Sequence, residues 1–391
     1  MSNTLSASSA APVHPALALG FRPFYLLAGL YAAGSVAVWA LQFAGVLPQV
    51  AVHGPWWHAH EMLFGYTLAV VTGFLFTAVR NWTQQATPTG APLALLAGLW
   101  LVGRLLSFTP LRPWSALTDT LFVLGVAWGI ARPLFASGNR RNYFFVPLVV
   151  GLGTANLGFH AAVNGWVAFS PTYALTLAAD VILFVMTVVA GRVVPMFTNN
   201  ALGGLPARRY ALLDRLALGS VLALIVADLL LPALVTTAVA AFAGLLHGAR
   251  LLLWAPWQTR RTPLLWILHV AYGWIVAYLA LRAASFLVAM PGQLALHALT
   301  VGAVGGLTLG MMTRSALGHS GRALRSGRAE VASYVLVQLA AIVRVLVPLV
   351  APALYAPSIA ISAALWSGAF GVFTVAYWPI LTRPRVDGKP G

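Results

Sequence analysis

Two histidines, a carboxylate and a thioether fall within one short stretch, His58-Ala59-His60-Glu61-Met62. The stretch opens an apolar run long enough to span a membrane, where ionisable groups are costly and usually have a function. Imidazole and thioether groups are ligands of copper and of haem iron. A neighbouring carboxylate can orient an imidazole N–H or carry a proton. We therefore expect a metal site here, and the alternative is a pair of interfacial histidines that hydrogen-bond to a loop.

The two histidines of this stretch leave two geometries open. Residues two positions apart on a helix are separated by about 200°, so His58 and His60 cannot both face one bundle interior. If the helix begins after Trp57, the two rings can serve two partners, such as a haem iron and a second metal. If His58 lies in a turn at Pro55 instead, both rings can chelate one copper ion. His58 and Met62, at i and i+4, share a face and form a soft pair for Cu(I) or haem iron.

Other apolar runs carry further candidate ligands. Asn156, His160 and Asn164 recur every four residues and form one polar stripe, which faces protein or a cavity, not lipid. The other interpretation of this stripe is hydrogen bonding between helices. His297 opens a run of small residues that lets a flat macrocycle or a neighbouring helix approach closely. His269 is either a further axial ligand or a packed histidine with its hydrogen bonds satisfied.

One apolar run contains charges of both signs. Asp180 and Arg192 are twelve positions apart, about 18 Å along a helix, so they cannot pair directly. Asp180 is a candidate second-shell group or proton carrier. Arg192 needs another partner, which can be Asp214, the turn at Asn199 and Asn200, a propionate or an anionic substrate.

Composition places the chain in the membrane class. Hydrophobic residues make up 60% of the chain and charged residues 8%, whereas soluble domains contain about 25% charged residues. The formal net charge of +16 does not indicate nucleic-acid binding, because the arginines stand singly between apolar runs. The chain has no cysteine, which excludes Fe–S clusters and thiolate-bound or covalently attached haem. Any metal is then held by His, Met, Asp or Glu, and any haem is bound non-covalently.

The apolar runs predict an all-α, polytopic transmembrane bundle of about twelve spans. A count of eleven stays open, because the break between the seventh and eighth runs depends largely on Pro232. Residues 1–15 are predicted as a disordered tail, residues 16–382 as a single transmembrane bundle, and residues 383–391 as a cytoplasmic tail. The runs cover residues 20–45, 59–80, 90–108, 115–135, 143–165, 172–197, 211–231, 232–254, 263–286, 293–315, 329–352 and 357–381.

One spacing occurs in both the second and the tenth run. In each, a histidine is followed five positions later by a glycine and eight positions after that by another. Two glycines and a histidine are too few to indicate an internal repeat, so we attribute the match to chance. The matching residues are His60, Gly65 and Gly73 in one run and His297, Gly302 and Gly310 in the other.

The arginines give the orientation of the bundle. With a cytoplasmic N-terminus, most of the 23 basic residues lie on the cytoplasmic side, which predicts both termini inside and an even number of spans. Arg104, Arg112 and Arg282 fall outside. The candidate metal-site residues of four runs then converge near the periplasmic face. A second polar cluster is predicted at the cytoplasmic face, from Arg22, Arg80, Arg192, Asn199, Asn200, Arg314 and His319.

Five segments, in this order along nearly the whole chain, resemble the NnrS family. The resemblance implies a multi-pass protein of the bacterial inner membrane that binds haem, non-covalent and b-type here, and copper. It also implies a role in denitrification and in resistance to nitric oxide, with nitric oxide or a nitrosyl species as ligand, and makes His58, His60, His160, His269, His297 and His319 candidate metal-site histidines. The segments are Gly20–Phe24, Trp57–Gly65, Arg141–Phe145, Gly191–Asn199 and His297–His319.

The chain also departs from the respiratory haem–copper oxidases. The tenth run offers a single histidine where those enzymes use His-x-His, and no run carries their paired-histidine copper helix. We therefore do not expect an oxidase-like binuclear centre.

Two classes of function follow from these residues. The first is a membrane protein that binds haem, with or without copper, and acts on nitric oxide, in which His58 or His60 pairs with His297 or His160. The second is a proton-coupled transporter of a small solute, metal or anion, in which Glu61 and Asp180 carry protons and Arg192, Asn199 and Asn200 form an inner gate. Polar clusters at opposite faces suit alternating access. A metal sensor or assembly factor without turnover is a third possibility, and the sequence predicts neither a reaction nor an oligomeric state.

Overall fold

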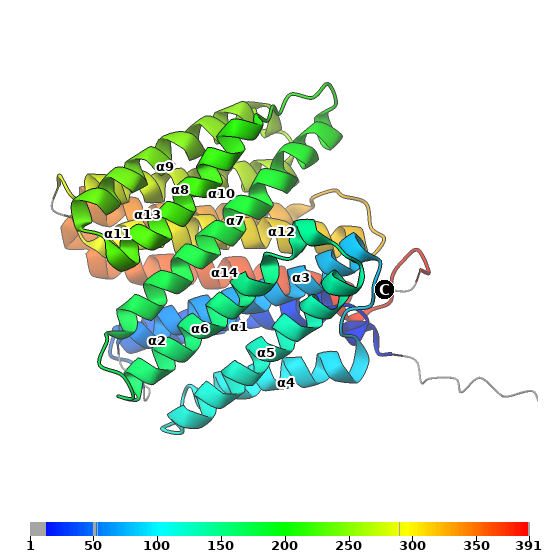
Figure 1. Ribbon diagram of the computed structural model, residues 1–391, viewed down its shortest axis with the longest axis horizontal. Coiled ribbons are helices and arrows are strands. Elements are labelled where there is room, and N and C mark those ends of the chain that lie inside the picture. The colour runs from blue at the N-terminus through cyan, green and yellow to red at the C-terminus, as the bar shows by residue number, and fades with distance from the viewer. Residues whose placement is uncertain (1–12, 50–51, 53, 289, 390–391) are drawn as a thin grey trace, which may run out of the picture.

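The computed structural model describes residues 13–49, 52, 54–288 and 290–389. Within these residues the protein is all-helical, without strands, as the apolar runs predict. The predicted disordered tail at residues 1–15 lies almost entirely outside the described residues. The helices run back and forth side by side, with α4 and α9 at opposite edges of the bundle (Figure 1). Their bounds are α1 Phe21–Phe43, α2 Pro55–His60, α3 Leu68–Thr83, α4 Gly90–Leu106, α5 Arg112–Ala136, α6 Phe145–Val163, α7 Pro171–Leu202, α8 Ala211–Leu230, α9 Ala233–Leu253, α10 Pro263–Ala284, α11 Gly292–His297, α12 Gly305–His319, α13 Arg328–Val350 and α14 Tyr355–Thr382.

The helices match the twelve apolar runs one for one, once α2 is joined to α3 and α11 to α12. The merged run that a count of eleven requires is not present, because α8 ends at Leu230 and α9 begins at Ala233. By length and composition, ten of the helical segments described can cross a membrane. The other two are α4, which has 17 residues, and α8, which carries three charged residues, Asp214, Arg215 and Asp228.

Three segments form the centre of the bundle. They are α2 with α3, then α7, then α11 with α12, and they are the most buried of the ten candidate spans. In chain order they are the second, sixth and tenth helical segments. The other helices pack around them, for example α1 against α3 and α14, and α10 against α12 and α9. The central segments are therefore the ones that can carry polar groups away from lipid.

Two of the central segments share an irregular start. A seven-residue π-helix, Glu61–Thr67, joins α2 to α3, and another, Ala298–Val304, joins α11 to α12. Each π-helix begins directly after a histidine, His60 or His297. The recurring histidine–glycine spacing therefore coincides with a recurring backbone geometry. π-Helices of this kind are frequent at functional sites.

The two ends of the described chain meet at one end of the bundle (Figure 1). Arg22, at the start of α1, donates from Nη1 to the carbonyls of Leu381 at 3.3 Å and Arg383 at 2.7 Å, beyond the last turn of α14. The amide of Val386 donates to the carbonyl of Ser320, just after α12. This arrangement fits an even number of crossings. We call the opposite end of the bundle, which carries His60 and His297, the outer end.

Candidate functional site

A buried cluster of five ionisable side chains lies at the outer end, between the start of the second span and α4, α5 and α6. We call it the His60 cluster, and it consists of His60, Glu61, Arg104, Asp119 and His160. Each of the five is 5% exposed or less, which for ionisable groups in an apolar bundle requires mutual pairing. His60, Glu61 and His160 are among the residues predicted from the sequence. Arg104 and Asp119 are not.

Three members of the cluster present ligand atoms to one another. Nε2 of His160 lies 3.1 Å from Oδ2 of Asp119, and Nε2 of His60 lies 3.7 Å from the same oxygen. One ligand atom from each of these three residues falls within 4.8 Å of the others. A transition-metal ion sits about 2 Å from each nitrogen or oxygen ligand, so small side-chain movements would close this triad around an ion. Two imidazoles and a carboxylate suit zinc, copper or iron.

The other members fix the orientation of the His60 ring. Oε1 of Glu61 lies 2.9 Å from Nδ1 of His60, and Oδ1 of Asn156 lies 2.8 Å from its Nε2. Arg104 bridges the two carboxylates, with Nη1 2.9 Å from Oε2 of Glu61 and Nη2 bonded to Asp119. Tyr31 also donates to Glu61. A carboxylate behind a ligating imidazole sets its tautomer and strengthens it as a ligand.

The charges of the cluster leave room for one more cation. Glu61 and Asp119 contribute two negative charges and Arg104 one positive charge. Both ring nitrogens of His60 face an oxygen acceptor. A metal ion bound between His60, Asp119 and His160 would supply positive charge opposite the second carboxylate, and a buried group of charges is stable only when it is balanced.

Two glycines provide the space for the bridging arginine and its partners. A Cβ on Gly65 would lie 3.0 Å from Nη1 of Arg104 and 3.1 Å from Oε2 of Glu61. A Cβ on Gly103 would lie 2.5 Å from Oδ1 of Asp119. Side chains at these two positions would therefore displace the ion pairs of the cluster.

A second histidine pair lies on another face of the second span. His58 stacks on Trp39 of α1, with ring centroids 5.1 Å apart and an interplanar angle of 14°. Its Nδ1 is buried and has no hydrogen-bond partner. His58 and His297 lie close enough to interact electrostatically, and both do so with Arg344 of α13. We call these three residues the His58 group.

The donor set of the His58 group fits a non-covalent haem. Nδ1 of His297 contacts the carbonyl of Gln293 at 2.6 Å, which leaves its Nε2 for an iron. Arg344 is buried, and its Nη1 lacks a partner while Nη2 donates to Tyr355 at 3.3 Å. Two imidazoles with free nitrogens and an unpaired guanidinium nitrogen are the groups that an axially ligated haem and its propionate need.

The two histidines of the opening stretch thus serve different groups. α2 begins at Pro55, so His58 and His60 are both helical and their rings diverge. Of the two geometries left open by the sequence, the structure has the one with two separate partners. The one in which both rings chelate a single ion would require His58 to lie in a turn.

Comparison with known protein families matches the model described as NnrS protein to residues 15–385. The chain belongs to the NnrS family. The match covers every helix from α1 to α14 and both histidine groups, so it confirms the resemblance found in the five sequence segments. No curated protein matches the chain.

Two predicted residues of this NnrS-family protein lie outside both histidine groups. His269 is packed, with Nδ1 3.0 Å from the carbonyl of Leu265 and Nε2 3.3 Å from that of Trp254. His269 is therefore the packed histidine with its hydrogen bonds satisfied, and not the axial ligand that the sequence also allowed. Asp180 is 1% exposed, and its partners are Asp228 of α8 and Arg282 of α10. Asp180 therefore belongs to a separate carboxylate pair rather than to the surroundings of His60.

Of the other residues predicted to surround the metal ligands, Asn156 lies at the site and Met62 does not. Asn156 contacts His60 directly, and the next stripe residue, Asn164, donates to the carbonyl of His160 at 2.7 Å. Met62 falls within the π-helix and is half-buried, and its carbonyl accepts from Thr67 at 2.7 Å. Asn156 and His160 of the polar stripe thus lie at the site, whereas the hydrogen bond of Asn164 is to the backbone of its own helix.

The residues predicted as a cytoplasmic cluster have local partners in this NnrS-family protein. Arg192 donates to Oδ1 of Asn142 at 2.7 Å, a partner that was not among those considered from the sequence, and Asp214 pairs with Arg209 and Arg250 instead. Asn199 exchanges hydrogen bonds with the backbone of Ala207, at 2.9 and 3.0 Å.

The other members of that predicted cluster also lie at the inner end. Arg314 stacks over the ring of Phe197, with its guanidinium carbon 3.9 Å from the centroid, and His319 lies against Phe21. Arg22 caps the end of α14 as described above. Arg80 is half-buried and Asn200 exposed. These contacts indicate helix-end packing rather than one assembled binding site.

Asp119 and Arg104 were missed for an identifiable reason. Arg104 stands at the end of an apolar run, where an arginine usually indicates the orientation of a span in the membrane, but its side chain is buried. The signal that could have revealed Asp119 is its position, since it is an acid seven residues into α5. The chain has only seven acidic residues, and an acid within a span usually has a functional partner.

Proposed function

We propose that this protein is a twelve-span haem- and copper-binding protein of the bacterial inner membrane, acting in the nitric oxide and nitrosative-stress response and in denitrification. One observation supports it most strongly. His58 and His60, two positions apart, enter two different groups, one half-buried and one buried, and each is completed by a histidine from another helix. Family membership supplies the link to nitric oxide. Arginine placement supplies the orientation, with both termini cytoplasmic and the outer end periplasmic.

In this proposal the His58 group holds the haem and the His60 cluster holds the copper. His58 and His297 would hold the haem, which would supply one-electron transfer, and His60, Asp119 and His160 would hold the copper, which would supply a binding position for a small ligand. Trp39 holds the His58 ring in place by stacking, and Arg344 neutralises a propionate.

The residues around the His60 cluster prepare it for a cation and limit access by water. Glu61 fixes the His60 ring through Nδ1, and Arg104 keeps both carboxylates ionised and in position. Phe159 stacks on the His60 ring, with centroids 4.5 Å apart. A cavity of about 20 Å³ borders His60, Glu61 and His160, which is room for roughly one water-sized ligand.

Optical spectra and metal analysis of the purified protein test the proposal. The wild type should show a Soret band and bound copper. His297→Ala should lose most of the Soret band and keep its copper, while His160→Ala should do the reverse. His14→Ala, at an exposed position outside the bundle, should keep both. Wild-type protein with neither a Soret band nor copper would end the proposal.

A proton-coupled transporter is the second candidate, favoured by the carboxylate pair. Asp180 and Asp228 interact electrostatically within the bundle, and two neighbouring buried carboxyl groups share a proton more readily than both ionise. Such a pair within a bundle resembles the proton sites of transporters. Substrate flux by metal-free protein reconstituted in vesicles would decide for this candidate, and abolition of that flux by Asp180→Asn would identify the pair as its proton site.

A further inference from the structure

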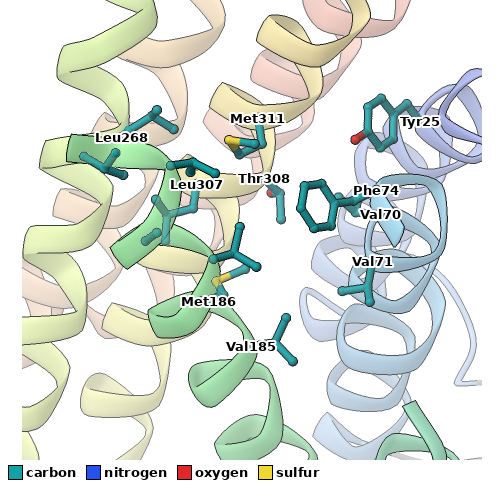
Figure 2. Close-up of a pocket in the computed structure, with 14 residues that line it drawn as sticks. Tyr25, Val70, Val71, Phe74, Val185, Met186, Leu268, Leu307, Thr308 and Met311 are labelled. Carbon is teal, nitrogen blue, oxygen red and sulfur yellow. The ribbon is translucent and has the colours of Figure 1, made fainter. Parts of the chain in front are cut away.

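The three central segments line a cavity of about 70 Å³ midway along the bundle, which is partly open beside the half-buried Phe74, Val189 and Val193. Figure 2 shows its wall, with valine, leucine and methionine side chains directed inward from separate helices. The wall is built by α3, α7, α10 and α12, with one residue from α1. Among its lining residues are Val70, Val71, Val185, Met186, Leu268 and Leu307.

The wall offers no free polar group to a guest. Of the lining residues, Tyr25 and Thr308 alone carry hydroxyl groups. The Tyr25 hydroxyl pairs with the hydroxyl of Ser315 at 3.1 Å. Oγ1 of Thr308 donates to the carbonyl of Val304 at 2.6 Å and pairs with the hydroxyl of Tyr66 at 2.5 Å.

The cavity is large enough for a water molecule, but its apolar lining favours a small apolar molecule instead. A buried water needs about 10–15 Å³ of such volume, so space is ample, but it also needs two to four polar partners. With both hydroxyls already engaged, a water molecule here would lose hydrogen bonds that it makes in solvent. Apolar cavities lined in this way stay dry and bind small apolar molecules.

The cavity lies on the inner side of both histidine groups. Val70 and Leu307 each follow the histidine of their span, His60 or His297, by ten residues, which is about 15 Å at the rise of a helix. This distance corresponds to roughly half the hydrocarbon thickness of a bilayer. Leu268 is completely buried and Val185 is 6% exposed, so these parts of the wall are shielded from lipid. β-Branched valines also have restricted rotamers, which helps to keep the space open.

We propose that this cavity is a binding site for a small, uncharged, apolar molecule, the size of a diatomic gas or a xenon atom. Binding itself does not depend on the function proposed above; only the identification of the natural occupant as nitric oxide rests on that function.

Crystals of the full-length protein under xenon pressure test the site. We expect an anomalous xenon peak between Val70, Val185 and Leu307. Val185→Phe should fill the cavity and remove the peak. Val375→Phe is the matched control, since Val375 is 77% exposed on α14, and it should keep the peak. Val185→Ala enlarges the space and should raise the xenon occupancy, which tests the site even if the phenylalanine variant does not fold.

Three results would overturn the proposal: xenon bound only at lipid-facing positions, ordered water inside the cavity, or an ordered acyl chain filling it. The outcome is distinct from the fate of the proposed function. Xenon in the cavity of a protein that binds no haem would uphold this site and reject the metal proposal, whereas a Soret band without xenon would do the opposite.

Discussion

Glu61 and Asp119 come from different helices and share one guanidinium. Nη1 of Arg104 donates to Glu61 at 2.9 Å and Nη2 bonds to Asp119, and all three side chains are buried. The arginine thus ties the end of α4 to the second span and to α5. The ion pairs hold in place the two histidines that border them.

Removal of the bridging guanidinium should destabilise the bundle. Arg104→Met leaves two buried carboxylates without their cation, and breaking a buried pair from one side costs about 3–5 kcal/mol. We expect a clear loss of thermal stability in detergent. Arg215→Met is the control, because Arg215 is exposed, and it should change stability little. Equal stability of the two variants would mean that the bridge is not structural.

Loss of the carboxylate behind His60 should weaken copper binding without removing the ligands. Glu61→Gln keeps the shape of the side chain but no longer stabilises the Nδ1 proton, and comparable changes lower metal affinity about 10–100-fold. Glu330→Gln, at the start of α13, should leave the affinity unchanged. Wild-type affinity should also fall as the pH is lowered, because imidazole and carboxylate ligands must be deprotonated to bind a metal, so protons compete with it. A competition titration with a copper chelator measures both effects, and a pH-independent affinity would contradict this ligand assignment.

Arg344 should affect haem retention through charge alone. Arg344→Gln removes the cation expected to pair with a propionate but leaves both imidazoles, so we predict a reduced haem content and a shifted reduction potential. Arg328→Gln changes an exposed arginine of the same helix and should alter neither. Spectroelectrochemical titration of the three proteins makes the comparison. An unshifted potential in Arg344→Gln would place the propionates elsewhere.

The carboxylate pair should be asymmetric. Asp228 takes both bonds from Arg282, one of them at 2.8 Å, whereas Oδ1 of Asp180 has no partner. Asp228→Asn should therefore destabilise the protein, because it removes the charge opposite Arg282, while Asp180→Asn should be tolerated. Thermal unfolding of the two variants in parallel checks this. A larger loss of stability for Asp180→Asn would mean that Asp180, and not Asp228, supplies the charge opposite Arg282.

The absence of cysteine makes the orientation directly measurable. Leu287, after α10, and Leu205, after α7, are 83% and 73% exposed and lie at the predicted outer and inner sides. In intact cells Leu287→Cys should react with a membrane-impermeant maleimide once the outer membrane is permeabilised. Leu205→Cys should react only after the inner membrane is broken. The opposite labelling pattern would mean that the bundle has the reverse orientation in the membrane.

Sequence reasoning predicted the helices well, because the length of an apolar run is enough to define a helix that lipid or protein will cover. It also predicted the depth of His60, His160 and His297, since depth follows from position along a run. It did not predict which side chains meet, because neighbouring helices and the direction of each face are set by packing. Arg104 is the clearest example, since an arginine at the end of a run reads as an orientation signal until a carboxylate is seen beside it.

Each π-helix allows the direction in which its preceding histidine points to differ from the direction set by the helix that follows. An α-helical turn holds 3.6 residues, so one residue added or removed rotates everything beyond it by about 100°. Deleting one residue from Glu61–Thr67 or Ala298–Val304 would restore regular α-helix and swing the histidine onto a different face, while α3 or α12 kept its packing. The wide turns thus let the histidine-bearing ends of these two spans and the apolar cavity between them be adjusted independently over evolutionary time.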